Sequence, residues 1–300
     1  MTDSIASLRH KITSAKDLQS VVRSMKTIAS SSIGQYEKAV HSLDDYYQTV
    51  QLGLMACLSA SAQSVESQLD QPAVIVSRSQ QNAPAVGVIV FGSDQGLVGQ
   101  FNEAMVEFVV ESLTKLPGEK IVWAVGERVE SRLLDTVLKT EGSFDLPGSI
   151  HTITALVGNI LIELEAKRDQ GVIDQVYLFH HRSESVSIYR PVCQHLLPLD
   201  AAWQRNLAGI HWPTNNLAEV MPNQDQTRRA FVREYLFVSL FRACAESLAS
   251  ENASRLAAMQ RAEKNIDELQ ENLNQTFHRL RQSDIDEELF DVLSGFNALN

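Results

Sequence analysis

Cysteine is scarce in this sequence: only Cys57, Cys193 and Cys244 occur, and no two of them are close along the chain. The odd number argues against a disulfide framework, and the spacing excludes a CxxC redox or zinc motif. We therefore expect a reducing compartment. No apolar run approaches the roughly eighteen residues that cross a bilayer, and the N-terminus lacks the apolar core of a signal peptide. Membrane association is thus expected only through partner proteins.

Basic residues are also in deficit. The chain has 26 Lys and Arg against 37 Asp and Glu, a formal net charge of −11. Nucleic-acid binding requires a basic stripe that displaces counterions from phosphates, so no nucleic-acid partner is expected. The hydrophobic content of 44% is enough to bury a full core in one or two domains.

Residues that interrupt helices are rare at both ends of the chain. No proline precedes Pro72 or follows Pro222, and apolar residues recur every three or four positions in both end segments. This spacing predicts one helix over residues 4–58 and another over 226–299, paired antiparallel with each other as a coiled coil. The C-terminal helix should be longer by roughly 30 Å, so part of it should protrude or dock elsewhere.

Several polar residues fall where a coiled coil prefers apolar ones: Gln19, Lys26, Asn252 and Arg255. They either fix the register or are satisfied by surrounding protein. The start of the chain also carries a basic face. In the antiparallel pairing this face should lie beside the acidic segment 284–291, although two solvated faces are the alternative. The basic residues are Arg9, Lys11, Lys16, Arg23 and Lys26.

Between the helices, a Ser- and Gln-rich connector (59–85) precedes an alternation of strands and helices. The alternation predicts an α/β fold with a mostly parallel, Rossmann-like sheet and one antiparallel edge. Three parts follow: 1–60, 61–225 and 226–300. We expect strands at 86–91, 120–125, 175–180 and 185–191, and helices at 102–116, 127–138 and 152–170.

A glycine-rich stretch, "FGSDQGLVGQFNEAM" (91–105), follows the first of these strands. A phosphate cradle of the P-loop type requires a Lys followed by Ser or Thr, and the dinucleotide fingerprint requires the order GxGxxG. Gln100 stands where the Lys would be, and neither pattern is present. A structural turn from strand to helix is the better interpretation, and no cofactor is expected.

The pair His180 and His181, with Cys193 and His195 after it, raises the question of a zinc site. Adjacent residues on a strand point to opposite faces, so only one of the two histidines could serve a given site. An edge hairpin without metal is the better interpretation. The sequence contains no HExxH motif and no clustered carboxylates, so no catalytic residue is expected.

Three parts of the chain carry a recognisable pattern: the C-terminal "LFRACAESLASENASRLAAMQRAEKNIDEL" and "RLRQSDIDEELFDVLSGFNAL", the opening "LRHKITSAKDLQSVVRSMKTIAS", and the glycine-rich loop. They resemble the gamma subunit of the F-type ATP synthase. The C-terminal segments resemble its terminal helix, the opening segment resembles its first helix, and the loop resembles its "SDRGLCGG.N". The chain departs from the family pattern at Gln95, Val98 and Asp286, and at Ser30–Tyr36, where the family has a basic run. These departures are typical of a divergent branch, such as an alternative bacterial F-type ATPase.

The resemblance implies a rotor shaft without catalytic residues. Its coiled coil would turn inside a ring of alpha and beta subunits, and its α/β domain would rest on the epsilon subunit and the c-subunit ring. The location implied is the cytoplasmic side of a bacterial inner membrane. By motif, the resemblance assigns subunit contacts to Met25, Arg255, Arg281 and Gln282. It assigns the structural loop to Gly96, Leu97, Gly99 and Asn102.

Two other functions fit parts of the pattern. A coiled-coil scaffold or adaptor with an inserted α/β domain would need no rotary partner, and a nucleotide-binding regulator would use the α/β domain alone. Co-purification with nucleotide-binding alpha and beta subunits favours the rotor. ATP binding by the isolated chain would favour the regulator, and we expect none.

Overall fold

The computed structural model describes residues 4–66, 85–184, 189–199, 203, 210, 212–214, 216, 218–219 and 223–298. The chain forms two compact units. We call Met1–Ser31 with Arg255–Asn300 the helical unit, and Ser32–Ser254 the α/β unit. Two long helices contribute to both units: α1 (Ile5–Ser42) and α7 (Gln224–Ala298).

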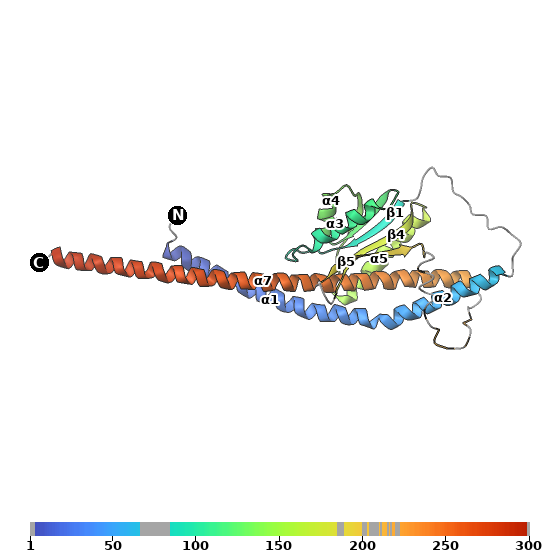
Figure 1. Ribbon diagram of the computed structural model, residues 1–300, viewed down its shortest axis with the longest axis horizontal. Helices are drawn as coiled ribbons and strands as arrows, with labels where there is room; N and C mark the ends of the chain where they lie inside the picture. Colours follow the sequence, from blue (N-terminus) through green and yellow to red (C-terminus); the bar gives the residue numbers. More distant parts are fainter. Residues whose placement is uncertain are drawn as a thin grey trace. The chain divides into compact units, whose positions relative to one another are not determined.

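A five-stranded sheet organises the α/β unit (Figure 1). Its strand order is β3-β2-β1-β4-β5, with parallel pairing throughout except between β4 and β5, which are antiparallel. The predicted α/β class with one antiparallel edge is therefore confirmed. The strands are β1 (Ala85–Phe91), β2 (Lys120–Val125), β3 (Thr140–Phe144), β4 (Ile173–Arg182) and β5 (Arg190–Leu197).

Helices cover both faces of the sheet. On one face, α3 (Phe101–Thr114) and α4 (Glu127–Leu134) pack on Val88 and Val90 of β1. On the other face, α5 (Ile150–Asp169) and the first part of α7 pack on Ile89 and Phe91. Every residue of β1 is buried, as expected of a central parallel strand that alternates between two cores.

The N-terminal helix is not continuous, which corrects the prediction for residues 4–58. A turn at Leu43 separates α1 from α2 (Asp44–Glu66). The hydroxyl of Ser42 donates to the carbonyl of Ala39, a local bond that competes with helix continuation. Asp44 and Asp45 then occupy the first turn of α2, where carboxylates complement the helix dipole.

Two strands differ from the sequence prediction. Strand β3 was missed, because "TEGSF" has one large apolar residue and alternates between exposed and half-buried positions at the edge of the sheet. The last strand was predicted over 185–191 but is β5, which begins at Arg190. Residues 185–188 lie outside the described part of the chain.

In the helical unit, α1 and α7 pair antiparallel, as predicted. The heptad seam of α1 is buried. Arg9 lies over the ring of Phe277, 5.5 Å from its centroid, and the Arg23 Nε atom lies 2.9 Å from a carboxylate oxygen of Glu263. Arg23 lies 14 residues after Arg9 on α1, and its partner Glu263 lies 14 residues before Phe277 on α7. The two helices therefore run antiparallel without a shift in register between these contacts. The seam residues are Leu8, Ala15, Val22 and Ala29.

Two of the four polar seam residues make contacts that fit a register-fixing role. The amide of Gln19 donates to Asp267, and the Lys26 ammonium lies 2.5 Å from Glu263. Asn252, in the α/β unit, instead donates to the carbonyl of Leu248 one turn back on α7. Arg255 is half-buried.

This register leaves the end of α7 beyond α1. Arg9 is level with Phe277, and α1 begins four residues earlier, at Ile5. The first residue of α1 is therefore level with residue 281 of α7. Residues 282–298 extend roughly 25 Å further. The acidic segment 284–291 therefore does not lie beside the basic face of α1, which corrects that prediction. Instead, Arg23 and Lys26 of that face bind Glu263.

Candidate functional site

The glycine-rich loop after β1 is closed by its own side chains. The backbone N–H of Ser93 donates to Asn102 Oδ1 at 3.0 Å, and Asn102 Nδ2 donates to Ser93 Oγ at 2.8 Å. The Ser93 hydroxyl in turn donates to the carbonyl of Gln95 at 3.0 Å. Ser93 and Asn102 are buried, so this pairing satisfies polar groups that water cannot reach.

Replacing Asn102 with alanine should lower the free energy of unfolding by about 1–3 kcal/mol, because the buried Ser93 N–H would lose its acceptor. Denaturant unfolding measures the change. The matched control is Gln100→Ala, at an exposed position two residues earlier, which should leave the unfolding midpoint almost unchanged. Equal effects of the two substitutions would show that the Ser93–Asn102 pairing does not hold the loop.

Asp94 of the glycine-rich loop supplies an anion at the N-terminus of α4, the helix that follows β2. Its Oδ1 atom accepts the N–H of Glu127 at the start of α4, at 3.0 Å, and its Oδ2 atom accepts the N–H of Leu146 at 3.2 Å. An anion at a helix N-terminus is stabilised by the free N–H groups and the helix dipole. Here the chain supplies that anion itself, so these donors are already used.

The crevice between β1 and β4 is filled as well. The strand order reverses there, which is where ligands bind in open α/β sheets. The buried ring of His181 lies 4.0 Å from that of Phe101 and 4.8 Å from that of Tyr189, measured between centroids. Burial lowers the pKa of His181 to about 3, so the ring is neutral at physiological pH. Side chains thus take the place of a ligand.

The tip of the loop has a constrained backbone. Leu97 and Gly99 have positive φ angles of 65° and 62°, and the Leu97 side chain is 61% exposed. A positive φ at leucine is unfavourable, so its surroundings must impose it. The buried Ser254 hydroxyl of α7 donates to the carbonyl of Val98 at 2.5 Å. Gly96 and Gly99 lie beside these residues, and Asn102 anchors the end of the loop.

The two adjacent histidines point to opposite faces of β4, as the sequence predicts. His180 Nε2 lies 2.9 Å from Glu246 of α7, whereas His181 packs on Phe101 of α3. His195 stacks on Tyr177 of the neighbouring strand. Within the described residues, no group of three or more His, Cys, Asp and Glu side chains could hold a metal ion.

Glu246 is the centre of a buried ionic cluster that sequence reasoning missed. Its carboxylate lies 2.8 Å from Arg182 Nε and 2.9 Å from Arg242 Nε, in addition to His180. Burial alone raises the pKa of Glu246, but the hydrogen bonds from His180, Arg182 and Arg242 outweigh it and lower the pKa to about 2. Arg242 also reaches Asp44 at 3.1 Å, so the cluster joins β4, α7 and α2.

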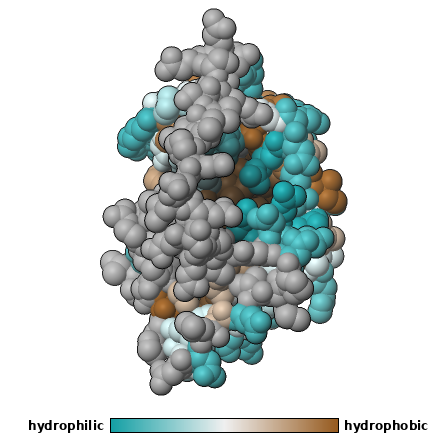
Figure 2. Space-filling model, turned by 90° about the vertical axis from the view of Figure 1, so that its right-hand side faces the viewer, coloured by the Kyte–Doolittle hydropathy of each residue, from teal (hydrophilic) through white to brown (hydrophobic). Residues whose placement is uncertain are grey.

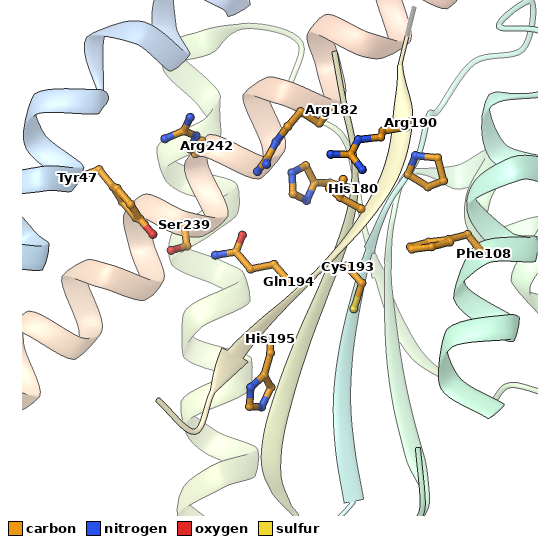
Figure 3. A pocket seen from close by; sticks show the side chains of 12 residues that line it. Tyr47, Phe108, His180, Arg182, Arg190, Cys193, Gln194, His195, Ser239 and Arg242 are labelled. Carbon is orange, nitrogen blue, oxygen red and sulfur yellow. The ribbon is translucent and has the colours of Figure 1, made fainter. Parts of the chain in front are cut away.

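A cavity of about 780 Å³ opens beside this cluster. Figure 3 shows Tyr47, Ser239 and Arg242 on one side of it and Phe108 of α3 on the other. Each arginine that lines it already binds a carboxylate, since Arg190 lies 3.1 Å from Glu184. The cavity therefore has little cationic charge left for an anionic ligand.

The family-derived contact residues lie in the helical unit. Met25 is half-buried on α1, in line with exposed apolar side chains on the same helix. Arg281 and Gln282 lie on α7, are exposed, and are level with the first residues of α1. Three exposed apolar residues near Met25 recur at helical spacing, along a line of α1 separate from the buried seam. They form a second apolar stripe, which sequence reasoning missed: Leu18, Val21 and Ile28.

Within the described part of the chain, no helix combines the length and apolarity needed to cross a bilayer. Figure 2 shows one face of the molecule, where hydrophilic side chains cover more of the described surface than hydrophobic ones do.

Comparisons with known proteins agree on one family. The family model described as ATP synthase matches residues 4–299. The chain is 26% identical to the ATP synthase gamma chain of Parvibaculum lavamentivorans and 27% identical to that of Granulibacter bethesdensis, with 99% of both chains covered in each case. A solved structure of Tetrahymena thermophila mitochondrial ATP synthase, central stalk and c-ring, contains a chain with a similar fold (TM-score 0.55, 22% identity), covering 81% of this chain and 99% of that one.

Proposed function

Because the chain belongs to the gamma-chain family of ATP synthases, whose members form the central rotor shaft, we propose how its two units divide that work. The helical unit turns inside a ring of three alpha and three beta subunits. The α/β unit rests on the epsilon subunit and the c-subunit ring. Ion flow through the membrane sector turns the shaft, and the turning shaft changes the nucleotide affinity of each beta subunit.

The observation that carries this proposal is the family match over residues 4–299, which includes both units. A scaffold that used only the coiled coil, or a regulator that used only the α/β domain, would not require a match of this extent. The second apolar stripe on α1 supports the proposal, because large exposed apolar side chains at helical spacing favour contact with another protein.

The asymmetry of such a shaft accounts for coupling. A ligand shifts a conformational equilibrium only if it contacts the alternative states differently. In the proposed complex, each beta subunit meets a different face of the helical unit, so the three subunits hold nucleotide with different affinities. Met25, Arg255, Arg281 and Gln282 would make or support these contacts. They are coupling residues and not catalysts.

The chain itself would supply no catalysis. Asp94 of the glycine-rich loop already occupies the backbone donors of Glu127 and Leu146, and Phe101 packs on His181 at the end of that loop. The proposed location is peripheral, on the cytoplasmic side of a bacterial inner membrane.

Affinity purification of the chain from its native host tests the proposal. Alpha, beta, epsilon and c subunits should co-purify with it, and the isolated chain should show no ATP binding in calorimetry. A stable homodimer without these subunits would contradict the rotor assignment. Stoichiometric ATP binding by the isolated chain would instead support a nucleotide-binding regulator.

A further inference from the structure

A second cavity, of about 790 Å³, lies in the α/β unit between α5 and the first part of α7. The α7 residues that line it recur at the i, i+3, i+4, i+7 spacing of one helix face. These residues are Arg229, Val232, Arg233 and Leu236. The α5 residues in the lining also share one helix face, and they are Glu165, Arg168 and Asp169. The cavity is therefore bounded by one face of each helix.

Arginine is concentrated in this cavity, although the surrounding unit is acidic. The α/β unit carries 16 Lys and Arg against 26 Asp and Glu. Four of the 16 basic residues line the cavity, and all four are exposed: Arg168, Arg228, Arg229 and Arg233. Three carboxylates share the lining: Glu165, Asp169 and Asp174. Together these groups leave the lining with one net positive charge.

The carboxylates of the chain do not satisfy these arginines. Arg168 and Arg229 form no hydrogen bond or ion pair within the described part of the chain. The other two arginines make one contact each: Arg228 Nη2 lies 3.1 Å from Asp225, and Arg233 Nε lies 3.2 Å from Glu165. Exposed ion pairs of this kind are weak. Since a guanidinium has five N–H donors, most donors of the four arginines stay open to a ligand.

The backbone around the cavity also favours an anion. Arg228 and Arg229 follow the first turn of α7, near the helix end whose dipole attracts anions and repels cations. The last carbonyls of α5 do not neutralise the arginines, because the chain uses them itself. The carbonyl of Lys167 accepts the N–H of Val172 at 3.0 Å, and that of Arg168 accepts the N–H of Gly171 at 2.9 Å.

We propose that this cavity binds a phosphate group, which Arg168 of α5 and Arg229 of α7 hold between them. The planar guanidinium matches phosphate oxygens in a two-point contact. The oxygens of a tetrahedral phosphate point in different directions, so one group can bridge arginines on two helices. The two oxygens of a carboxylate lie in one plane and suit a single guanidinium.

A nucleotide is not the ligand that this cavity favours. No aromatic residue lines it, so a base would find no ring to stack on. ATP should therefore bind no more tightly than inorganic phosphate. The inference goes beyond the proposed rotor role and does not depend on it.

The phosphate group has two possible sources, and the test separates them with the full-length chain. One probe is vesicles of phosphatidylcholine with or without about 30% phosphatidylglycerol, an anionic phospholipid. The other is inorganic phosphate in calorimetry. A lipid-headgroup site should give binding only to the phosphatidylglycerol vesicles. A free-phosphate site should give one-to-one binding of inorganic phosphate without binding to vesicles.

The variant Arg168→Gln with Arg229→Gln removes both principal contacts and breaks no ion pair of the described chain. Its affinity for the bound probe should fall about thirtyfold, with an unchanged thermal midpoint. The control variant Lys38→Gln with Arg128→Gln removes the same charge from exposed positions of the α/β unit outside the cavity. The control should bind as the wild type does.

Three results would overturn the inference. The first is binding to neither probe. The second is an equal loss of affinity in the two variants, since general surface charge would then be the cause. The third is binding of succinate as tight as that of phosphate, since the ligand would then be a carboxylate.

Arg229→Lys keeps the inference testable if the double variant unfolds. Lysine retains the positive charge but lacks the planar fork, so this variant should stay folded and bind more weakly than the wild type. Unchanged affinity would contradict the two-point contact.

Discussion

Replacing Glu246 with alanine should lower the free energy of unfolding by about 3 kcal/mol, the amount that corresponds to a pKa lowered from 4.5 to about 2. The carboxylate is 8% exposed and binds His180, Arg182 and Arg242. Its removal leaves two arginines without their shared anion. Both arginines are partly exposed, so hydration compensates part of the lost interaction. The decrease in the free energy of unfolding should therefore be smaller than the decrease on breaking a fully buried ion pair.

The lowered pKa of Glu246 also predicts how the free energy of unfolding changes with pH. A carboxyl group whose pKa is lowered by folding stabilises the protein above its unfolded pKa, near 4.5, and loses this effect as the pH falls through about 2. The wild type should therefore lose this contribution between about pH 4.5 and pH 2. The Glu246→Ala variant should lack that step.

Chemical denaturation at several pH values measures both effects. Glu234→Ala is the matched control, because Glu234 is an exposed glutamate on the same helix that accepts a hydrogen bond from Tyr46. It should change stability little. If Glu246→Ala proves no more destabilising than this control at neutral pH, the ionic cluster does not hold α7 to β4.

Replacing Met25 with lysine should lower the number of ions pumped per ATP hydrolysed, while the complex still assembles. Met25 is half-buried on α1, in line with the exposed Leu18, Val21 and Ile28. In the proposed complex this residue contacts a partner subunit, and an unpaired charge there would cost several kcal/mol, enough to lower the population of the tight contact at least about tenfold. In the same proposal ATP is hydrolysed on other subunits, so hydrolysis should continue.

Proton or sodium pumping into membrane vesicles, measured together with ATP turnover, tests this prediction. Thr27→Lys is the control, because it adds the same charge at an exposed position two residues away, off the apolar stripe. Met25→Leu should retain coupling. A Met25→Lys complex that pumps as many ions per ATP as the wild type would show that this part of α1 does not transmit rotation.

The heptad pattern predicted the paired helices well, because a strict seven-residue repeat has one simple structural solution. Leu8, Ala15, Val22 and Ala29 are buried as that repeat requires. The break at Leu43 escaped detection, since it involves neither proline nor glycine. The position of the acidic segment was also wrong, because charge complementarity alone does not fix the register between two helices.

The sequence revealed less of the α/β unit's polar interior. Strand β3 lies at the sheet edge and lacks the apolar alternation that strand prediction requires. Asp94 binds N–H groups 33 and 52 residues away, and sequence spacing carries no signal for such contacts. Glu246 did leave a signal: it is a lone carboxylate between buried residues, Ala245 and Ser247. A carboxylate in buried surroundings requires a cation from another part of the fold to pair with it.

Rotation of the chain relative to the head is the central claim, and a single-molecule assay tests it directly. Val137, 92% exposed in the α/β unit, can be replaced by cysteine to carry a bead, with the alpha and beta subunits fixed to a surface. On addition of ATP the bead should turn in one direction in discrete steps. A bead that stays still while the same complex hydrolyses ATP would contradict the assignment of this chain as the rotor shaft.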